Sequence, residues 1–276
     1  MNTIYKCFPN GKFKVLTMSY DDGREGDRKL VEIFNKNGIK GTFHLNSGLI
    51  EKYEPSISDS FGGRIQKEEI KELYKGHEVA CHTLTHPTIE RSPISQVALQ
   101  VIEDRKELES LVNYTVRGLS YPNGSYNDSI KNLLPNLGIE YSRIVGSSEN
   151  FSMPKDFYEW KSTCHHNNKN LLKLADEFLS LSKKQYLYMF YVWGHSFEFD
   201  RDNNWHVIED FCEKIGNNDD IWYATNIQIV DYLKVCDDLQ FSMNGNFVYN
   251  PSVQSAWISV NNKIYEIKGG EQVVFD

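Results

Sequence analysis

The sequence lacks the features that mark membrane proteins and exported proteins. No apolar run approaches the ~20 residues that a membrane-spanning helix requires, so we expect no transmembrane segment and no membrane partner. The N-terminal residues show no signal-peptide hydrophobic region, which argues against export by that route. The five cysteines are scattered and odd in number, so they do not indicate a disulfide framework. Together these absences predict a cytoplasmic protein.

Clusters of basic residues are also missing, and the formal net charge of the 276 residues is −8. Because a nucleic-acid partner needs lysines and arginines to neutralise its phosphates, we expect no such partner. A neutral sugar is compatible with this charge. Hydrophobic residues make up 40% and charged residues 25% of the chain, which is typical of a globular protein with a large buried core.

Strand-like and helix-like segments alternate from Phe13 onward within a predicted barrel domain of residues 1–238, which favours a parallel sheet with helical crossovers. Strands are expected at residues 13–19, 41–45, 77–81, 115–121, 139–145, 158–164, 186–193 and 221–225. Helices are expected at residues 28–34, 67–74, 95–111, 128–137, 171–181, 205–215 and 226–235. Strands followed by helices in this order predict an α/β fold with a (β/α)8-type barrel. In such barrels the chemistry is located at the carboxyl ends of the strands.

The pattern changes after Asp238. Short alternating runs at residues 240–243, 246–249, 255–260, 263–267 and 272–275 are separated by turn residues such as Asn244-Gly245. They predict a small C-terminal antiparallel β appendage at residues 239–276. Because so few strands are not expected to be stable alone, the appendage is expected to pack on the barrel of residues 1–238.

Two adjacent carboxylates, Asp21 and Asp22, end the first expected strand and are followed by Gly23. Because successive side chains of a strand point to opposite faces, neighbouring aspartates converge only where the strand is ending. By itself, Asp-Asp-Gly is most often a solvated turn. Its interpretation as a site depends on histidines that come later in the chain.

His82 and His86 come directly after the third expected strand. Pro87 disfavours a helical backbone at His86, so the two imidazoles are expected on a turn. One aspartate with two histidines is a ligand set suited to a catalytic Zn²⁺ that keeps an open position for water. The second aspartate would then be free to act as a base.

With Trp193-Gly194-His195 at the end of the seventh expected strand, these motifs resemble the polysaccharide deacetylase family (NodB-like, carbohydrate esterase family 4) over about residues 13 to 235. The resemblance implies a distorted barrel and one divalent ion, with Zn²⁺ as the expected metal, held by Asp22, His82 and His86. It further implies that Asp21 is the general base, which accepts a proton from water activated by the ion, and that His195 is the general acid, which donates a proton to the leaving amine. The alternative for His195 is a histidine packed beside Trp193.

Tyr121-Pro122-Asn123 is similar to the third motif of that family. The similarity implies a substrate-binding loop in which the backbone N–H of Asn123 is the oxyanion donor. Ser120 stands where the family has an arginine that partners the base. The fourth motif is looser and contains Trp160, which either walls the acetyl pocket or packs in the core.

Arg143 is our candidate to replace that missing arginine. Alternation along the fifth expected strand puts it on the same face as Tyr141 and Val145, and in the barrel interior an unpaired arginine would be costly. We therefore predict that Arg143 pairs with Asp21 and supports catalysis. The alternative is a surface or interface arginine.

Two further stretches allow more than one interpretation. Cys164-His165-His166 ends the sixth expected strand and could donate a metal ligand or bind substrate, although a polar loop on the rim is the simpler interpretation. Glu198 lies three residues after His195 and could orient its imidazole, or be an exposed loop carboxylate.

The resemblance implies a metal-dependent hydrolase that removes N-acetyl groups from N-acetylglucosamine-type carbohydrate. Within the same class, an O-acetyl esterase or an allantoinase-like cyclic-amide hydrolase is the nearest alternative. From another class, a catalytically silent, metal-stabilised carbohydrate-binding barrel is kept open by Ser120.

Overall fold

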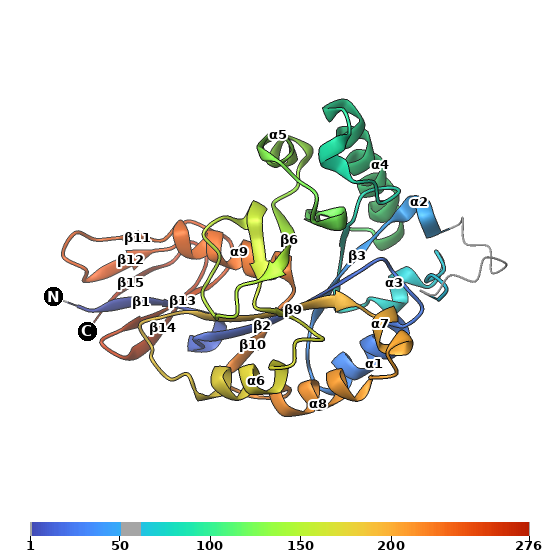
Figure 1. Cartoon of the computed structure of the whole chain (residues 1–276). Coiled ribbons are helices and arrows are strands. Elements are labelled where there is room, and N and C mark those ends of the chain that lie inside the picture. Colours follow the sequence, from blue (N-terminus) through green and yellow to red (C-terminus); the bar gives the residue numbers. More distant parts are fainter. Residues whose placement is uncertain (1, 51–61, 276) are drawn as a thin grey trace.

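The computed structural model describes residues 2–50 and 62–275, and its centre is a parallel sheet (Figure 1). Within these residues the sheet has nine strands, and the expected α/β architecture is confirmed. The strands are β2 (Lys14–Asp21), β3 (Gly41–Leu45), β4 (Glu78–Cys81), β5 (Gly118–Ser120), β6 (Tyr141–Ser147), β7 (Trp160–Ser162), β8 (Cys164–His165), β9 (Tyr188–His195) and β10 (Ile221–Tyr223).

The sheet closes on itself as a distorted barrel. Its order is β7-β6-β5-β4-β3-β2-β9-β8, with every pair parallel. Thr163 alone separates β7 from β8 along the chain, so one continuous stretch pairs with β6 at its start and with β9 at its end. The single strand expected at residues 158–164 is therefore split between two neighbours. β10 pairs with residues 14–16 of β2 and lies outside this closed ring, which distorts the barrel further.

Helices connect the strands and surround the barrel (Figure 1). They are α1 (Asp27–Lys36), α2 (Ser47–Ile50), α3 (Ile70–Leu73), α4 (Ile94–Val112), α5 (Asp128–Leu133), α6 (Leu171–Ser180), α7 (Phe197–Arg201), α8 (His206–Ile215) and α9 (Asn226–Asp237). The short helices α2 and α7 were not predicted, because one or two turns carry too little apolar periodicity. In the part of the chain that the structure describes, no helix is long and apolar enough to cross a bilayer.

The helix α4 shows how a helix attaches to the barrel and reaches the site. Its buried stripe contains Val97, Val101 and Leu108, spaced as an amphipathic helix requires. Asp104 lies in the same stripe and is fully buried. A carboxylate at such a position needs hydrogen-bond donors, and it finds them in the loops at the carboxyl ends of β3 and β4.

The C-terminal residues form small antiparallel sheets on the side of the barrel away from α7 (Figure 1). In the described residues one sheet has the order β1-β13-β14 and another the order β11-β12-β15. Their strands are β1 (Ile4–Cys7), β11 (Gln240–Phe241), β12 (Phe247–Tyr249), β13 (Ala256–Val260), β14 (Lys263–Ile267) and β15 (Gln272–Val274). β1 was not predicted, and its pairing with β13 ties the start of the chain to the C-terminal strands.

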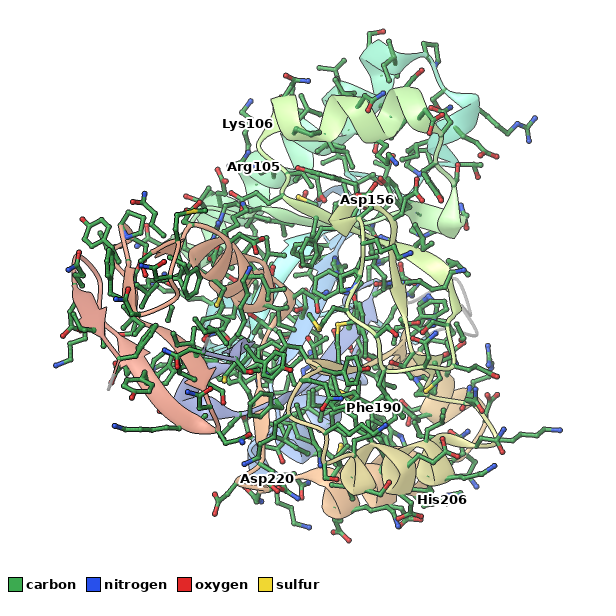
Figure 2. All side chains as sticks on the ribbon, turned by 90° about the vertical axis from the view of Figure 1, so that its left-hand side faces the viewer. Arg105, Lys106, Asp156, Phe190, His206 and Asp220 are labelled. Carbon is green, nitrogen blue, oxygen red and sulfur yellow. The ribbon has the colours of Figure 1, made fainter. Side chains whose placement is uncertain are left out.

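A buried hydrophobic cluster joins the barrel to these sheets. It combines Tyr141 and Tyr191 of the barrel interior with Val248 and Ile258 of the small sheets. A second cluster, which includes Phe190, lies between the strands and the surrounding helices. Figure 2 views the molecule from the side of the small sheets, with the described side chains drawn as sticks.

Because the barrel and the small sheets share a core, we predict that they unfold together. Ile258→Ala removes a fully buried side chain of β13 and is expected to lower the free energy of unfolding by about 2–5 kcal/mol. Ile264→Ala in the neighbouring strand β14, where the side chain is 40% exposed, is the matched control and should cost much less. Denaturant unfolding followed by tryptophan fluorescence and circular dichroism checks this. Two separate transitions, with Ile258→Ala shifting one of them, would contradict a shared core.

Candidate active site

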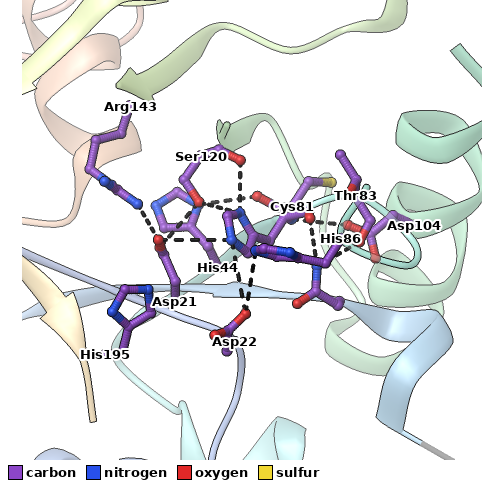
Figure 3. A network of polar contacts seen from close by, with 12 residues as sticks. Asp21, Asp22, His44, Cys81, Thr83, His86, Asp104, Ser120, Arg143 and His195 are labelled. Carbon is purple, nitrogen blue, oxygen red and sulfur yellow. Dashed lines mark hydrogen bonds and ion pairs between the residues drawn. The ribbon is translucent and has the colours of Figure 1, made fainter. Parts of the chain in front are cut away.

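The carboxyl ends of the parallel strands bring the candidate residues to one edge of the barrel (Figure 3). β2 ends at Asp21, the loop after β4 carries His82 and His86, and β9 ends at His195. Asp21 is in register with His195 on one side and with His44 of β3 on the other. In parallel barrels this edge carries the active site.

Asp22, His82 and His86 lie close enough to share one ion. The Oδ1 atom of Asp22 is 4.0 Å from Nε2 of His82 and 3.9 Å from Nε2 of His86. The candidate donor atoms of the three residues lie within 4.8 Å of one another. One carboxylate and two imidazoles match the protein ligands of a catalytic zinc site that keeps a position open. The structure therefore brings together the ligand set proposed from the sequence.

The hydrogen bonds of His82 leave the correct nitrogen available for a metal. Its Nδ1 atom is 2.8 Å from the backbone oxygen of Ser120 and therefore carries the proton. Its Nε2 atom then has a free lone pair and faces Asp22. Burial lowers the pKa of His82 to about 4, although the charges of Asp21 and Asp22 oppose the shift. The neutral imidazole, which is the form that binds metal, is therefore favoured at neutral pH.

Left-handed backbone conformations concentrate around this ligand set. The φ angle is 81° at Asp22, 65° at Thr83, 57° at His86 and 57° at Asn123. Such angles are uncommon outside glycine, and for the β-branched Thr83 the conformation is a genuine outlier. Strain of about 1–3 kcal/mol per residue persists only where the surroundings hold it, and it clusters at functional sites.

Asp21 is buried and has partners on two sides. The Nη2 atom of Arg143 contacts Oδ2 of Asp21, and the hydroxyl of Ser120 donates to Oδ1 at 3.1 Å. The guanidinium of Arg143 also lies 4.3 Å from the ring centre of Trp193, a cation–π contact. Burial raises the pKa of Asp21, but the guanidinium of Arg143 together with the imidazoles of His82, His44 and His195 outweighs it and holds the pKa well below its usual range. Asp21 is therefore ionised, as a general base must be.

The predicted pairing of Arg143 with Asp21 is present, and the register of two strands explains it. Ser120 of β5 lies opposite Arg143 of β6. The backbone of Arg143 therefore lies on the strand next to the position at which the family motif has its arginine, at the usual spacing of about 4.8 Å between neighbouring strands. The Arg143 side chain is fully buried, so the alternative of a surface arginine is wrong. Its contribution to catalysis stays a prediction.

His195 stands where β9 passes into α7. Its Nδ1 atom is 3.6 Å from Oε1 of Glu198, and its backbone N–H donates to Oε2 of Glu198 at 3.4 Å. Burial lowers the pKa of His195, but the carboxylates of Glu198, Asp21 and Asp22 more than offset this and the pKa is raised overall. A raised pKa favours the protonated imidazole that a general acid needs.

These side chains border one cavity of about 500 Å³, which opens at the carboxyl edge of the barrel. Its lining residues are Asp21, Asp22, Arg24, Leu49, Arg64, His82, Thr85, His86, Tyr121, Asn123, Val145, Trp193, His195 and Phe197. Tyr121 and Asn123 therefore lie where a substrate-binding loop was proposed, with Pro122 buried between them. Asn123 is on the turn of residues Pro122–Gly124 that follows β5.

The structure does not place Trp160 at this cavity. Its side chain is fully buried in the barrel interior, with its ring centre 5.5 Å from that of Tyr141 and 5.1 Å from that of Tyr191. The proposal that Trp160 walls an acetyl pocket is therefore corrected to core packing. The reason is its position at the start of β7, from which the indole packs in the cluster shared with the small sheets.

Asp104 and His44 are site residues that sequence reasoning missed. Asp104 of α4 accepts the backbone N–H groups of His82 at 3.1 Å and of Ser47 at 2.8 Å, so it holds the loops behind the ligands. An aspartate in the apolar stripe of a helix was the available signal. His44 lies beside Asp21 in register and is fully buried, which lowers its pKa to about 3. A histidine in the middle of an apolar strand was the corresponding signal.

Two arginines at the cavity were also missed. The Nη1 atom of Arg64 donates to the backbone oxygen of Asp22 at 2.5 Å, and Nη1 of Arg24 donates to the backbone oxygen of Gly62 at 3.0 Å. Both arginines line the cavity. Arg64 thereby supports the strained backbone of a metal-ligand candidate, a role that depends on contacts between loops and leaves no local motif.

Comparison with known proteins points to one family. A family model described as polysaccharide deacetylase matches residues 9–142. The chain is 27% identical to the chitin deacetylase of Arthroderma benhamiae over 142 residues, which are 49% of this chain and 33% of that protein. It is 20% identical to the uncharacterized protein YlxY of Bacillus subtilis over 127 residues, which are 46% of this chain and 36% of that protein. The matches thus span about a third of the length of these curated relatives.

Solved structures share the fold. A candidate polysaccharide deacetylase from Mycobacterium smegmatis superposes with a TM-score of 0.62 at 15% identity, over 84% of this chain and 94% of that one. The carbohydrate esterase family 4 domain of a xylanase from the hindgut metagenome of Trinervitermes trinervoides gives a TM-score of 0.53 at 15% identity, over 81% and 92% of the two chains. A mutant of BA3943, described as a family 4 pseudoenzyme with restored enzymatic activity, gives 0.51 at 17% identity, over 82% and 70%.

The arrangement of Asp22, His82 and His86 predicts one zinc equivalent per chain. His86→Ala removes a ligand directly and should weaken zinc binding by more than the about 10–100-fold that loss of an outer partner causes. His206→Ala on the exposed start of α8 is the matched control and should bind as the wild type does. Calorimetric titration of metal-free protein measures both. Unchanged affinity and stoichiometry in His86→Ala would place the metal elsewhere.

Proposed function

Because this chain belongs to the polysaccharide deacetylase family (carbohydrate esterase family 4), we propose that it is a metal-dependent hydrolase that removes N-acetyl groups from N-acetylglucosamine-type carbohydrate. The proposal rests on one observation: three kinds of group line the same cavity. They are a set of metal-ligand candidates, the ionised buried carboxylate of Asp21 and the imidazole of His195, which can be protonated. The experiment that tests it is acetate release from chitin oligosaccharides, with and without chelator.

Asp22, His82 and His86 would hold the ion, and their donor set fits it because His82 presents an unprotonated Nε2. When bound, a divalent ion supplies Lewis acidity, which polarises a carbonyl oxygen and lowers the pKa of water. Arg64 holds the backbone of Asp22, and Asp104 holds the backbone of His82. These contacts keep the donors oriented.

Asp21 and His195 would divide the proton transfers of amide hydrolysis. The Asp21 carboxylate accepts a proton from the attacking water as its oxygen forms a bond to the acetyl carbon. The protonated His195 donates a proton to the amide nitrogen as the C–N bond breaks, so that acetate and a free amine leave. The opposite pKa shifts of the two residues favour this division, since the pKa of Asp21 is lowered and the pKa of His195 is raised.

The oxyanion that develops during attack needs a donor, and the backbone N–H of Asn123 is our candidate. Asn123 lies on a tight turn with left-handed backbone and borders the cavity together with Tyr121. Removing one preorganised oxyanion donor, a side-chain amide in a serine protease, costs about 2.7–4 kcal/mol of transition-state stabilisation.

A catalytically silent carbohydrate-binding barrel is the second candidate, and the presence of a pseudoenzyme among the similar folds keeps it relevant. The sequence supported a binding barrel because Ser120 stands where the family has an arginine. The contact of Arg143 with Asp21 weakens that argument, because a buried arginine supplies the charge that Ser120 lacks.

Acetate release from acetylated xylan and ring opening of allantoin, assayed beside chitin oligosaccharides, separate the remaining hydrolase alternatives. Zinc binding without any of these activities would favour the binding barrel.

Within the aspartate pair, we predict that base and ligand can be separated. Asp21→Asn keeps the ligand set and should retain zinc while kcat falls by about 10²–10⁴-fold. Asp22→Asn should instead weaken zinc binding. Metal analysis and acetate release on the same preparations measure both effects. The opposite pattern would mean that the roles within the pair are reversed.

The register of Ser120 and Arg143 allows a test by exchange. Arg143→Ala leaves Asp21 buried without its cation and should lower the free energy of unfolding by about 3–5 kcal/mol, together with kcat. The double variant Ser120→Arg/Arg143→Ser moves the guanidinium to the adjacent strand and should recover part of both losses. Arg117→Ala is the control, because Arg117 pairs with Glu140 and Asp231 away from the cavity. A wild-type kcat in Arg143→Ala would contradict a role for this arginine.

A further inference from the structure

A second histidine-rich group lies behind His195. It consists of His165, His166, His195 and Glu198, which we call the Glu198 cluster. Oε2 of Glu198 is 3.1 Å from Nε2 of His165 and 3.1 Å from Nε2 of His166, while Oε1 is 3.6 Å from Nδ1 of His195. The cluster is built from β8, the residue after it, the end of β9 and α7.

The donor atoms of His165, His195 and Glu198 lie within 4.8 Å of one another, as a metal site would require. The tautomer of His165 argues against that use. The backbone N–H of Asn167 donates to Nδ1 of His165 at 3.1 Å, so the proton of neutral His165 is on Nε2. A metal ligand needs a lone pair at this Nε2, which instead points its N–H at Glu198. His82 has the opposite tautomer, with Nδ1 facing a carbonyl and Nε2 free.

His166 is held in place by packing. It is fully buried, and its ring stacks on Tyr20 and Phe199 with ring centres 5.7 Å and 4.1 Å apart. A side chain at Gly194 would meet Nδ1 of His166 at 2.0 Å, so the glycine before His195 is required for this packing. His166 therefore holds Nε2 in a fixed position 3.1 Å from Oε2 of Glu198, an ion-pair distance rather than an aligned hydrogen bond.

Glu198 is kept ionised by these neighbours. Burial raises the pKa of Glu198, but the imidazoles of His165, His166 and His195 outweigh it and hold the pKa well below its usual range. Arg201 adds a positive charge 3.8 Å from Oε1. The exposed fraction of the Glu198 side chain is 13%, so the interpretation as an exposed loop carboxylate does not hold.

His195 joins the Glu198 cluster to the cavity. Among the described residues, its Nδ1 has no hydrogen-bond partner at the present 3.6 Å, and the nearest carboxylate oxygen is that of Glu198. The backbone N–H of His195 already donates to the same carboxylate, which holds Glu198 beside the ring. The second ring nitrogen, Nε2, is then the one left for the cavity that His195 lines.

We propose that Glu198, clamped by His165 and His166, is a positioning residue that accepts the Nδ1–H of His195 and directs Nε2 of His195 into the cavity. The proposal rests on the proposed function, in which His195 is the acid, and it gives the Cys164-His165-His166 segment a role that is neither metal binding nor substrate binding. Position and protonation of the acid then depend on residues that never touch substrate.

The test compares Glu198→Gln with Asp202→Asn in the full chain. Glu198→Gln removes the charge with little change of shape, while Asp202→Asn removes a charge four residues away that pairs with Arg201. Glu198→Gln should retain one zinc equivalent and an unchanged KM, with kcat on chitin oligosaccharides lowered by about 10–100-fold. Asp202→Asn should leave all three unchanged. His165→Gln should lower kcat in the same direction but less, because His166 still holds Glu198.

A spectroscopic readout is independent of activity and of whether Glu198→Gln folds. Long-range ¹H–¹⁵N correlation of the histidine rings in the wild type, with His195 assigned from the spectrum of His195→Gln, should show neutral His195 protonated at Nδ1. Proton on Nε2 in the wild type would overturn the proposal. So would wild-type kcat in a folded Glu198→Gln variant, or a second zinc equivalent that this variant loses. Absence of deacetylase activity in the wild type would refute the proposed function, while the tautomer would still decide the positioning.

Discussion

The buried ion pair of Asp21 and Arg143 is the interaction on which the rest of the site depends. A carboxylate inside a barrel loses hydration worth several kcal/mol, and a well-placed cation must compensate for it. Arg143 of β6 and Ser120 of β5 contact Asp21 at the end of β2, and Trp193 of β9 packs against the guanidinium of Arg143. The pair therefore ties four strands together at the edge where the cavity opens, and it fixes the proposed base beside the candidate ligand Asp22.

Hydrogen-bond polarity gives the two histidine–carboxylate groups of this edge different chemistry. In the first, the backbone carbonyl of Ser120 accepts a hydrogen bond from Nδ1–H of His82, so Nε2 has a free lone pair for a metal. In the second, the backbone N–H of Asn167 donates to Nδ1 of His165, so the proton of the neutral ring is on Nε2, which lies 3.1 Å from Oε2 of Glu198. Residue types alone do not separate these cases. What distinguishes them is the group bonded to Nδ1 of each imidazole, because it decides whether Nε2 carries a proton or a free lone pair.

Local signals were sufficient for the centre of the site. The expected strand ends at residues 19, 81 and 193 lie within two residues of the observed ends at Asp21, Cys81 and His195, because apolar runs end there, and parallel strands bring their carboxyl ends to one edge. Alternation along β6 was enough to turn Arg143 inward. Trp160 and Glu198 were harder, because the side on which each one packs depends on strands and helices distant in the sequence.

The sequence by itself determined the α/β order and the edge that holds the candidate site, since both depend on periodicity within single segments. It indicated Asp21, Asp22, His82, His86 and His195 through their places at the ends of expected strands and through motifs that resemble those of the family. Tertiary structure alone decided how the ring closes, with one stretch shared between β6 and β9, and how β1 joins the C-terminal strands. It also decided the contacts of Asp104, His44 and the Glu198 cluster. The physical reason is that closure and the burial of polar groups are set by pairings between distant segments, whose energies appear only when those segments meet.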